Sequence, residues 1–188
     1  VHPLEPERTP ILDALSRVLV EDVESDTDIP PFDNSAMDGY AVRSSDVAGA
    51  TTAAPVTLMV LGTVAAGYES GARLGSGNAI RIMTGAPLPR GADAVVPFED
   101  TSDFDRSKME RLAAPAQRID VRKAVKTGDH VRPAGEDVRR GERVMAKGRL
   151  IRPQEIGLLA SLGYDTVLVH PVGVLTWRRV RRRGEQVL

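Results

Sequence analysis

The segment PPFDNSAMDGYAV at 30–42 holds the densest group of polar side chains in the chain. Asp33, Asn34, Ser35 and Asp38 bring two carboxylates, an amide and a hydroxyl into six residues. Oxygen-bearing side chains of this kind bind phosphate, hydroxyl groups or a hydrated Mg²⁺, because hard cations prefer oxygen ligands. The same residue types also form turns by hydrogen-bonding to nearby backbone, and residue chemistry alone favours the turn.

A second candidate is RIMTGAPLPRGADAVV at 81–96, where a strand-like run passes into a glycine loop. The hydroxyl of Thr84 and the backbone N–H of Gly85 can cradle an oxyanion. The guanidinium of Arg81 is a donor suited to phosphate. No Gly-Lys-Ser/Thr follows, so this is no P-loop. An ordinary connection between strands is the alternative interpretation.

Two acidic pairs lie elsewhere, Glu99-Asp100 and Glu136-Asp137. Each is a candidate for metal binding or acid–base chemistry, and each is also typical of a solvated turn. The chain has no cysteine and no Gly-x-Ser-x-Gly segment, which removes support for thiolate metal sites and acyl-enzyme chemistry. No metal-binding spacing relates the histidines, which are His2, His130 and His170.

Composition excludes several classes of partner. The 188 residues suit one medium domain or two small ones. With 25 basic against 26 acidic residues, no global field favours nucleic acid or a membrane surface. No apolar run approaches the ~18 residues of a membrane span. Residues 1–8 are polar and do not resemble a signal peptide, so we expect a cytoplasmic protein with no membrane or nucleic-acid partner.

The elements that would position these residues are mostly short strands. Strand-like runs at 56–64, 79–83, 94–97 and 118–121 are separated by glycine and proline, which predicts a small all-β unit, a barrel or a sandwich. Earlier in the sequence, Thr9-Pro10 is typical of a helix N-terminus. A helix is predicted from there because apolar residues recur at helical spacing, at Ile11, Leu12, Leu15, Val18 and Leu19.

The C-terminal part returns to mixed structure. We predict strands at 142–146 and 149–151, a helix that begins at Pro153 and stops at Gly163, and strands at 166–169 and from Val172. Five arginines between 178 and 183 are a candidate phosphate-binding cluster or a solvated end, and the solvated end is favoured.

Four segments together resemble one family. PPFDNSAMDGYAV (30–42), RIMTGAPLPRGADAVVPFED (81–100), RPAGEDVRRGE (132–142) and RPQEIGLLASLGY (152–164) occur in the order found in the molybdopterin molybdenumtransferases, which comprise the bacterial MoeA proteins and the gephyrin E domain. The resemblance covers most of the chain, and its first string is the most specific.

The resemblance implies an α+β, mainly β fold in an elongated, two-lobed chain. It implies an N-terminal helix segment at 1–20, a discontinuous mixed α/β first domain at 21–45 and 132–170, and an inserted β-barrel-like domain at 46–131. Residues 171–188 would start a truncated molybdopterin-binding third domain. The sequence departs from the family there, because Trp177 and the arginines stand where the family has Gly-Asp-Glu.

The implied activity is insertion of molybdenum from molybdate into adenylylated molybdopterin, with Mg²⁺ as cofactor and release of AMP. By motif match, Asp38 and Thr84 are the catalytic candidates, with Asp38 as tentative Mg²⁺ ligand. The candidates for substrate binding are Asp33, Ser35, Arg81, Gly85 and Glu99.

The implied partners are a second copy of the chain, whose third domain would complete the site, and an upstream molybdopterin adenylyltransferase. The isolated chain is expected to be inactive. One alternative is a non-catalytic dimerisation or scaffold module of the gephyrin type. Another is a nucleic-acid binder that acts through Arg178–Arg183.

Overall fold

The computed structural model describes residues 5–68, 71, 73–106 and 116–171. The chain divides into two compact units, one formed by Val1–Asp26 with Glu142–Leu188 and the other by Thr27–Gly141. These limits differ from the domain boundaries expected at 45/46 and 131/132. The family's domain division and the elongated shape stay predictions.

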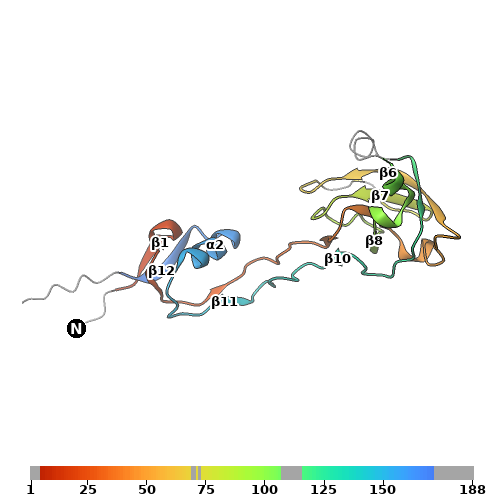
Figure 1. The fold of residues 1–188 in the computed structure, drawn as a ribbon. Helices are drawn as coiled ribbons and strands as arrows, with labels where there is room; N and C mark the ends of the chain where they lie inside the picture. The colour runs from red at the N-terminus through yellow and green to blue at the C-terminus, as the bar shows by residue number, and fades with distance from the viewer. Residues whose placement is uncertain (1–4, 69–70, 72, 107–115, 172–188) are drawn as a thin grey trace, which may run out of the picture. The chain divides into compact units, whose positions relative to one another are not determined.

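The second unit is built on a five-stranded sheet (Figure 1). Its strands, in spatial order, are β8 (Ala94–Pro97), β5 (Gly39–Val42), β7 (Asn78–Ile82), β6 (Val56–Val64) and β9 (Arg118–Val121). β6 and β7 are parallel and the other neighbours are antiparallel. Short 3₁₀ turns follow the strands, η2 (Ser44–Asp46), η3 (Phe98–Asp100) and η4 (Ser102–Asp105). The strands predicted at 56–64, 79–83, 94–97 and 118–121 are thus confirmed.

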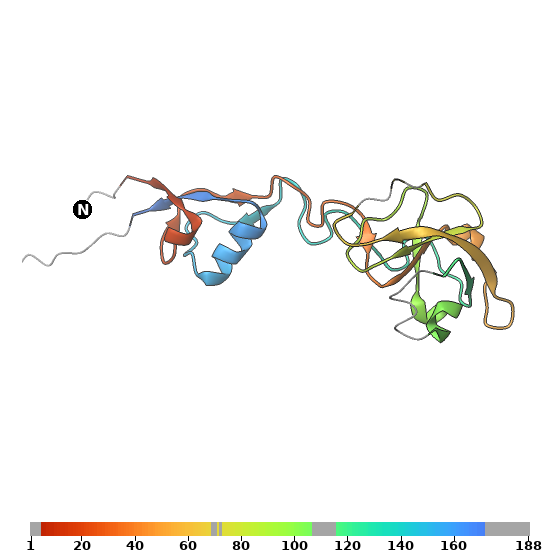
Figure 2. The same cartoon turned by 90° about the horizontal axis from the view of Figure 1, so that it is seen from above.

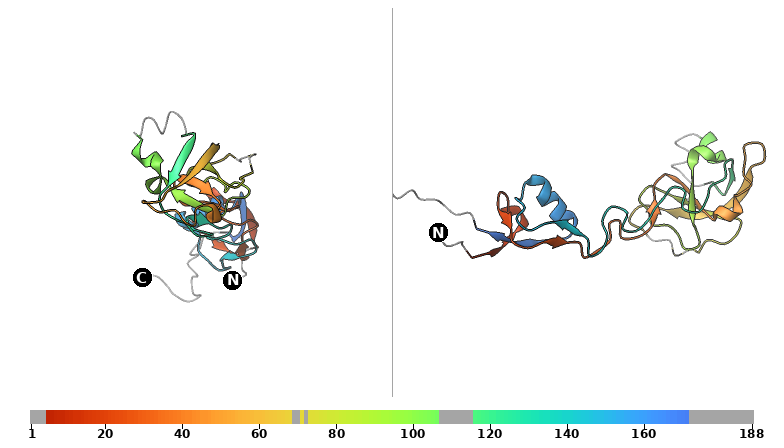
Figure 3. Two further views of the ribbon diagram at one scale, coloured as in Figure 1. Left: turned by 90° about the vertical axis from the view of Figure 1, so that its right-hand side faces the viewer. Right: turned by 90° about the horizontal axis from the view of Figure 1, so that it is seen from below.

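This sheet curls into a half-barrel (Figure 3), which confirms a mainly β fold. The strands β5 and β8 are buried at every position, because apolar residues cover both faces of the sheet. One face packs residues such as Tyr40, Leu58 and Ile119, and the other packs residues such as Ile80, Ile82 and Val95. Strands buried on both faces are continuously apolar, as these are.

The strand β4 (Asn34–Ser35) explains why the first motif lies in the second unit. It pairs with β10 (Val131–Arg132), and Asn34 also bridges to Pro87. Residues 30–42, 81–100 and 132–141 are therefore joined by backbone hydrogen bonds in one unit.

The first unit combines small sheets with one described helix. β1 (Glu7–Pro10), β12 (Thr166–His170) and β2 (Val18–Leu19) form one sheet, and β3 (Val23–Glu24) pairs with β11 (Arg143–Met145). The helix α2 (Pro153–Ser161) lies beside the three-stranded sheet (Figure 2). It ends where predicted, since Gly163 takes a left-handed φ of 81° that favours glycine.

The helix predicted after Thr9-Pro10 is wrong. The segment forms the strand β1, the 3₁₀ turn η1 (Ile11–Asp13) and the strand β2. Pairing with β12 holds Glu7–Pro10 extended, and Ser16 takes a φ of 63° that no α-helix contains. Leu12 and Leu15 are 78% and 47% exposed whereas Leu19 is 1% exposed, so the apolar residues of this segment do not form one buried helix face.

Two further strand predictions have different outcomes. The strand expected at 149–151 is reduced to a single bridge between Leu150 and Val18. The strand expected from Val172 and the arginines at 178–183 lie outside the described residues.

Within the described part of the chain, no helix is long and apolar enough to cross a membrane.

We predict that Gly39→Ala destabilises the five-stranded sheet by about 3 kcal/mol or more, as overpacking a rigid site does. A Cβ on Gly39 would sit 2.1 Å from the carbonyl oxygen of Val96, and backbone atoms cannot move aside cheaply. Chemical denaturation measures the loss. Gly62→Ala is the matched control, because a Cβ on that strand glycine meets nothing within 4 Å. Equal stability of the two variants would contradict the packing argument.

A second prediction concerns acid stability of the first unit. Hydrogen bonds from Arg152 and then Arg149 lower the pKa of the buried Glu155 from 4.5 to about 2. A lowered pKa in the folded state contributes stability that is complete above pH 4.5 and is lost as pH falls toward 2. The protection of the amides in 153–170, taken relative to the intrinsic exchange rate at each pH, should therefore fall by roughly tenfold or more across that window. Glu155→Gln should exchange faster at pH 7 and lose most of this pH dependence; an unchanged pH profile would refute the assignment.

Candidate active site

Three chain segments leave the five-stranded sheet at the same end of its strands. Gly39, at the start of β5, lies opposite Ile82 near the end of β7 and opposite Pro97 at the end of β8. Asp38 immediately precedes β5, and Thr84 follows β7 by two residues. The antiparallel register thus brings together residues 46 positions apart in sequence.

Asp38 and Thr84 form a hydrogen-bonded pair, called here the Asp38–Thr84 pair. The backbone N–H and the hydroxyl of Thr84 both donate to Oδ1 of Asp38, each at a distance of 2.7 Å. Hydrogen bonds to a carboxylate are short and strong, so they fix the rotation of this side chain. Both residues are solvent-exposed. Among the described residues, no donor reaches the other carboxylate oxygen, Oδ2.

The geometry of the glycine loop differs from the sequence expectation. We expected the Thr84 hydroxyl and the Gly85 N–H to share one oxyanion. The N–H of Gly85 instead donates to the carbonyl oxygen of Ser35 over 2.8 Å, and both donors of Thr84 are directed at Asp38. The two donors of Thr84 therefore orient the carboxylate of Asp38 in place of a bound oxyanion.

Asp33 and Ser35 build the loop that carries Asp38. Oδ1 of Asp33 accepts the N–H of Ala134 over 2.8 Å. The hydroxyl of Ser35 is buried, donates to the carbonyl oxygen of Met37 over 2.5 Å and accepts from the Met37 N–H over 3.3 Å. These contacts are those of a turn, the alternative that residue chemistry favoured.

Arg81 lies inside the second unit, 7% exposed. Its guanidinium carbon is 5.2 Å from the centroid of the Phe98 ring, within cation–π range. The ring of Phe98 packs edge-on against Tyr40 at 5.5 Å between centroids. Arg81 is therefore buried, whereas both members of the Asp38–Thr84 pair are exposed.

A buried polar network that the sequence did not predict involves Tyr40 of β5. The Tyr40 hydroxyl donates to Oδ2 of Asp103 over 2.9 Å, and Arg106 donates to Oδ1 over 2.8 Å. Burial and the hydrogen bond to Asp103 raise the pKa of Tyr40 above its usual range. Tyr40 stood within the first motif, but nothing in the sequence linked it to an aspartate 63 residues away.

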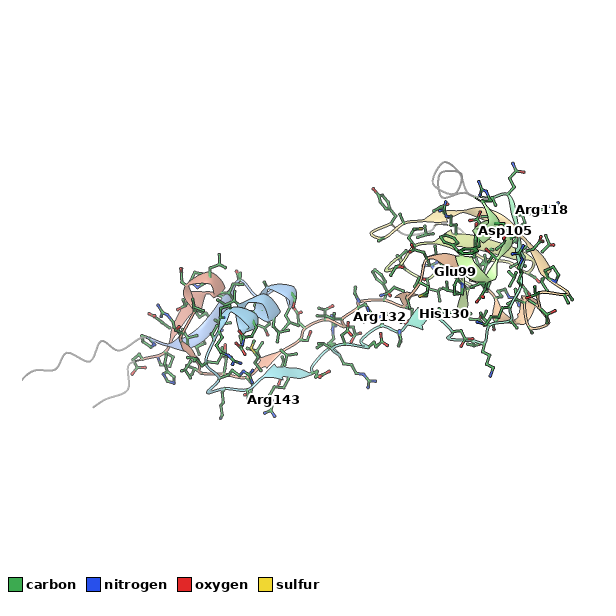
Figure 4. All side chains as sticks on the ribbon, viewed as in Figure 1. Glu99, Asp105, Arg118, His130, Arg132 and Arg143 are labelled. Carbon is green, nitrogen blue, oxygen red and sulfur yellow. The ribbon has the colours of Figure 1, made fainter. Side chains whose placement is uncertain are left out.

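Glu99 and Asp100 do not act as a pair. Glu99 is exposed on η3 (Figure 4), and its neighbour Asp100 forms an ion pair with Lys123 at 3.3 Å. The register places Glu99 just after β8, at the same end of the sheet as Asp38. Among the described residues, no contact joins the two carboxylates.

The third motif forms its own ion pairs. Arg132 binds Glu136 at 2.6 Å and Asp137 at 2.7 Å. Hydrogen bonds from its guanidinium to Glu136 and then Asp137 raise the pKa of Arg132. Figure 4 places Arg132 and His130 on the segment that pairs with the first motif, and the His130 carbonyl oxygen accepts the N–H of Ala36 over 2.9 Å.

No group of three or more acidic, histidine or cysteine side chains that would suit a metal ion occurs in the described ranges. The Asp38 carboxylate has one oxygen held by Thr84, and its other oxygen accepts no hydrogen bond from the described residues. Mg²⁺ keeps several waters and commonly takes only one or two protein carboxylates together with substrate phosphates. A single carboxylate fits that mode of binding and does not fit a closed protein metal cage.

Comparison with known proteins identifies the class. Residues 1–163 match the family model described as the MoeA N-terminal region, domains I and II. The chain belongs to this family.

The relatives are enzymes by name. The chain is 38% identical to the molybdopterin molybdenumtransferase of Bacillus subtilis (strain 168), over 88% of this chain and 37% of the relative. It is 40% identical to molybdopterin molybdenumtransferase 2 of Mycobacterium tuberculosis (strain ATCC 25618 / H37Rv), over 88% and 38% of the two chains. The crystal structure of the molybdopterin biosynthesis MoeA protein from Pyrococcus horikoshii OT3 superposes with a TM-score of 0.77 and 37% identity, over 88% of this chain and 41% of that one. The chain thus spans about two-fifths of the length of the relatives it matches.

We predict that Tyr40→Phe lowers the free energy of unfolding of the second unit by about 1–2 kcal/mol, because it removes a buried hydrogen bond to a charged acceptor. Chemical denaturation followed by circular dichroism measures this. Tyr164→Phe is the matched control: its hydroxyl donates to the Glu24 carbonyl oxygen over 2.7 Å at an exposed position, so its loss should be smaller. A Tyr40 variant no less stable than the control would show that the Asp103 contact contributes nothing.

Proposed function

We propose that this chain provides the domain I and II part of a molybdopterin molybdenumtransferase. The enzyme inserts molybdenum from molybdate into adenylylated molybdopterin and releases AMP. The observation that carries the proposal is the Asp38–Thr84 pair, in which one carboxylate oxygen is fixed by two 2.7 Å hydrogen bonds in an exposed position. The names of the relatives support the same reaction.

The pair suits adenylate cleavage because that step needs a positioned water and a proton acceptor. Thr84 holds Oδ1, so Oδ2 has a fixed direction in which to accept a proton from water or to hold a water of a hydrated ion. The Thr84 hydroxyl keeps an oxygen lone pair with which to accept a further hydrogen bond. Preorganised groups of this kind cost no reorganisation when the reaction occurs.

Mg²⁺ is the cofactor we propose for this site, with Asp38 as its protein carboxylate. Molybdate and the pterin phosphates are anions that repel each other, and a divalent cation supplies the charge that brings them together. Asp33 and Ser35 support the site by shaping the loop, whereas Glu99 has an exposed carboxylate that can face the substrate.

We propose that the working site forms between two copies of the protein and receives its substrate from a molybdopterin adenylyltransferase. The scaffold alternative of the gephyrin type is not favoured, because the relatives that match carry the name of the transferase. A scaffold would also have no need of an oriented, exposed carboxylate.

The test joins this chain to the remaining domains of the Bacillus subtilis relative. We predict that Asp38→Asn and Thr84→Ala each reduce molybdenum insertion by ~10²–10³-fold, the usual cost of removing one preorganised group. Production of active cofactor from Mg²⁺, molybdate and adenylylated molybdopterin measures the rate. The 188-residue chain alone should give no insertion.

The matched controls are Thr57→Ala and Asp120→Asn, which remove the donor and the acceptor charge of another exposed Thr–Asp hydrogen bond, of 2.6 Å between β6 and β9. These should keep the parent rate. Near-normal insertion by either site variant would refute its catalytic assignment. A rate that falls only together with the melting temperature would show that the residue forms a structural turn.

A further inference from the structure

We propose that Arg81 is a positioning residue: its buried guanidinium holds the Phe98 ring, and through that ring it fixes the backbone on which Asp38 stands. The inference replaces direct phosphate binding as the role of Arg81. Its consequence for turnover rests on the proposed function, but its structural content does not.

The first step is the contact between Arg81 and Phe98. Arg81 lies on β7 directly opposite Tyr40 on β5, and its side chain is 7% exposed. Its guanidinium carbon lies 5.2 Å from the Phe98 ring centroid. A planar guanidinium over an aromatic face attracts it electrostatically, and burial strengthens the attraction. Tyr40 meets the same ring edge-on at an interplanar angle of 73°, so the ring is held from two sides.

The second step runs from Phe98 to Asp38. The N–H of Phe98 donates to the carbonyl oxygen of Asp38 over 3.2 Å. The carbonyl oxygen of Phe98 accepts the Thr101 N–H at 3.0 Å and the Thr101 hydroxyl at 2.9 Å. η3 is therefore pinned at both ends, and a shift of the Phe98 ring would move the backbone donor that anchors Asp38.

The third step is that Arg81 lies on β7, whose end leads through Met83 directly to Thr84. Met83 donates its N–H to the carbonyl oxygen of Val64 over 3.2 Å, which holds the end of β7 against β6. Arg81 is thus linked to both members of the Asp38–Thr84 pair, to Asp38 through Phe98 and to Thr84 through the backbone that continues from β7. Lysine would not serve equally, since it has no planar group to lie over the ring.

The direct test is amide hydrogen exchange in the 188-residue chain. Arg81→Met keeps side-chain length and removes the guanidinium, and we expect the amides of Thr84 and Phe98 to exchange roughly tenfold faster. Phe98→Leu should accelerate the Thr84 amide similarly, whereas Phe98→Tyr, which keeps the ring, should restore protection. Arg90→Met is the matched control, because it removes an exposed arginine from the connection between β7 and β8.

Unchanged exchange at Thr84 in both Arg81→Met and Phe98→Leu would overturn the inference, whatever happens to activity. Should Arg81→Met unfold the sheet, the comparison of Phe98→Leu with Phe98→Tyr decides alone. Equal exchange in those two variants would overturn the inference as well.

Kinetics in the joined protein separates positioning from binding. A positioning role predicts that Arg81→Met lowers kcat at least tenfold and leaves KM for adenylylated molybdopterin within about threefold, because only transition-state alignment is lost. A raised KM with unchanged kcat would show instead that Arg81 binds the substrate. If Asp38→Asn has no effect on insertion, the proposed function fails, while the exchange result still stands for Arg81.

Discussion

The close approach of β5 to β8 at Gly39 is the constraint on which the candidate site depends. A Cβ there would sit 2.1 Å from the Val96 carbonyl oxygen, so only glycine permits the strands to pair at this point. That pairing sets the register of β5 against both β7 and β8. The register in turn brings the Asp38 carboxylate to Thr84 and the Asp38 carbonyl oxygen to the N–H of Phe98. A shift of one residue would reverse the side-chain directions and separate the pair.

The site has an exposed part and a buried part with different tasks. The exposed part is the Asp38–Thr84 pair, in which two donors orient one carboxylate. The buried part holds Arg81 and Tyr40 with the partly buried Phe98, backed by the Asp103 carboxylate and its hydrogen bonds from Tyr40 and Arg106. Charged groups are costly to bury unless they are paired, and the Asp103 carboxylate is paired by both of these donors. The arrangement gives a rigid support to a group that must meet charged substrates in water.

Local sequence patterns predicted β6, β7, β8 and β9 of the five-stranded sheet, because turn residues bound each apolar run, but they did not predict β5 (Gly39–Val42). They also predicted α2, since Pro153 and Gly163 mark its ends by their backbone preferences. The helix predicted from Ile11 to Leu19 failed because pairing of Glu7–Pro10 with β12, some 160 residues away, is a non-local interaction that no local pattern reports.

The candidate site was predicted in its residues but not in its geometry. Asp38 and Thr84 were chosen by resemblance, and their contact depends on a register that the sequence does not display. Arg81 was expected to face phosphate, because an arginine beside a glycine loop suits that role. Its burial could not be foreseen, since it depends on contact with Phe98 of η3, whose ring also packs against Tyr40 of β5.

The central claim is that Asp38 and Thr84 act as one catalytic unit, and a double-mutant cycle tests it most directly. Molybdenum insertion would be measured for Asp38→Asn, Thr84→Ala and the double variant in the joined protein. Residues that act as a unit show losses that do not multiply, so the double variant should turn over at about the rate of the slower single variant. Losses that multiply across the cycle would contradict the account, because they would show that Thr84 contributes independently of the carboxylate it holds.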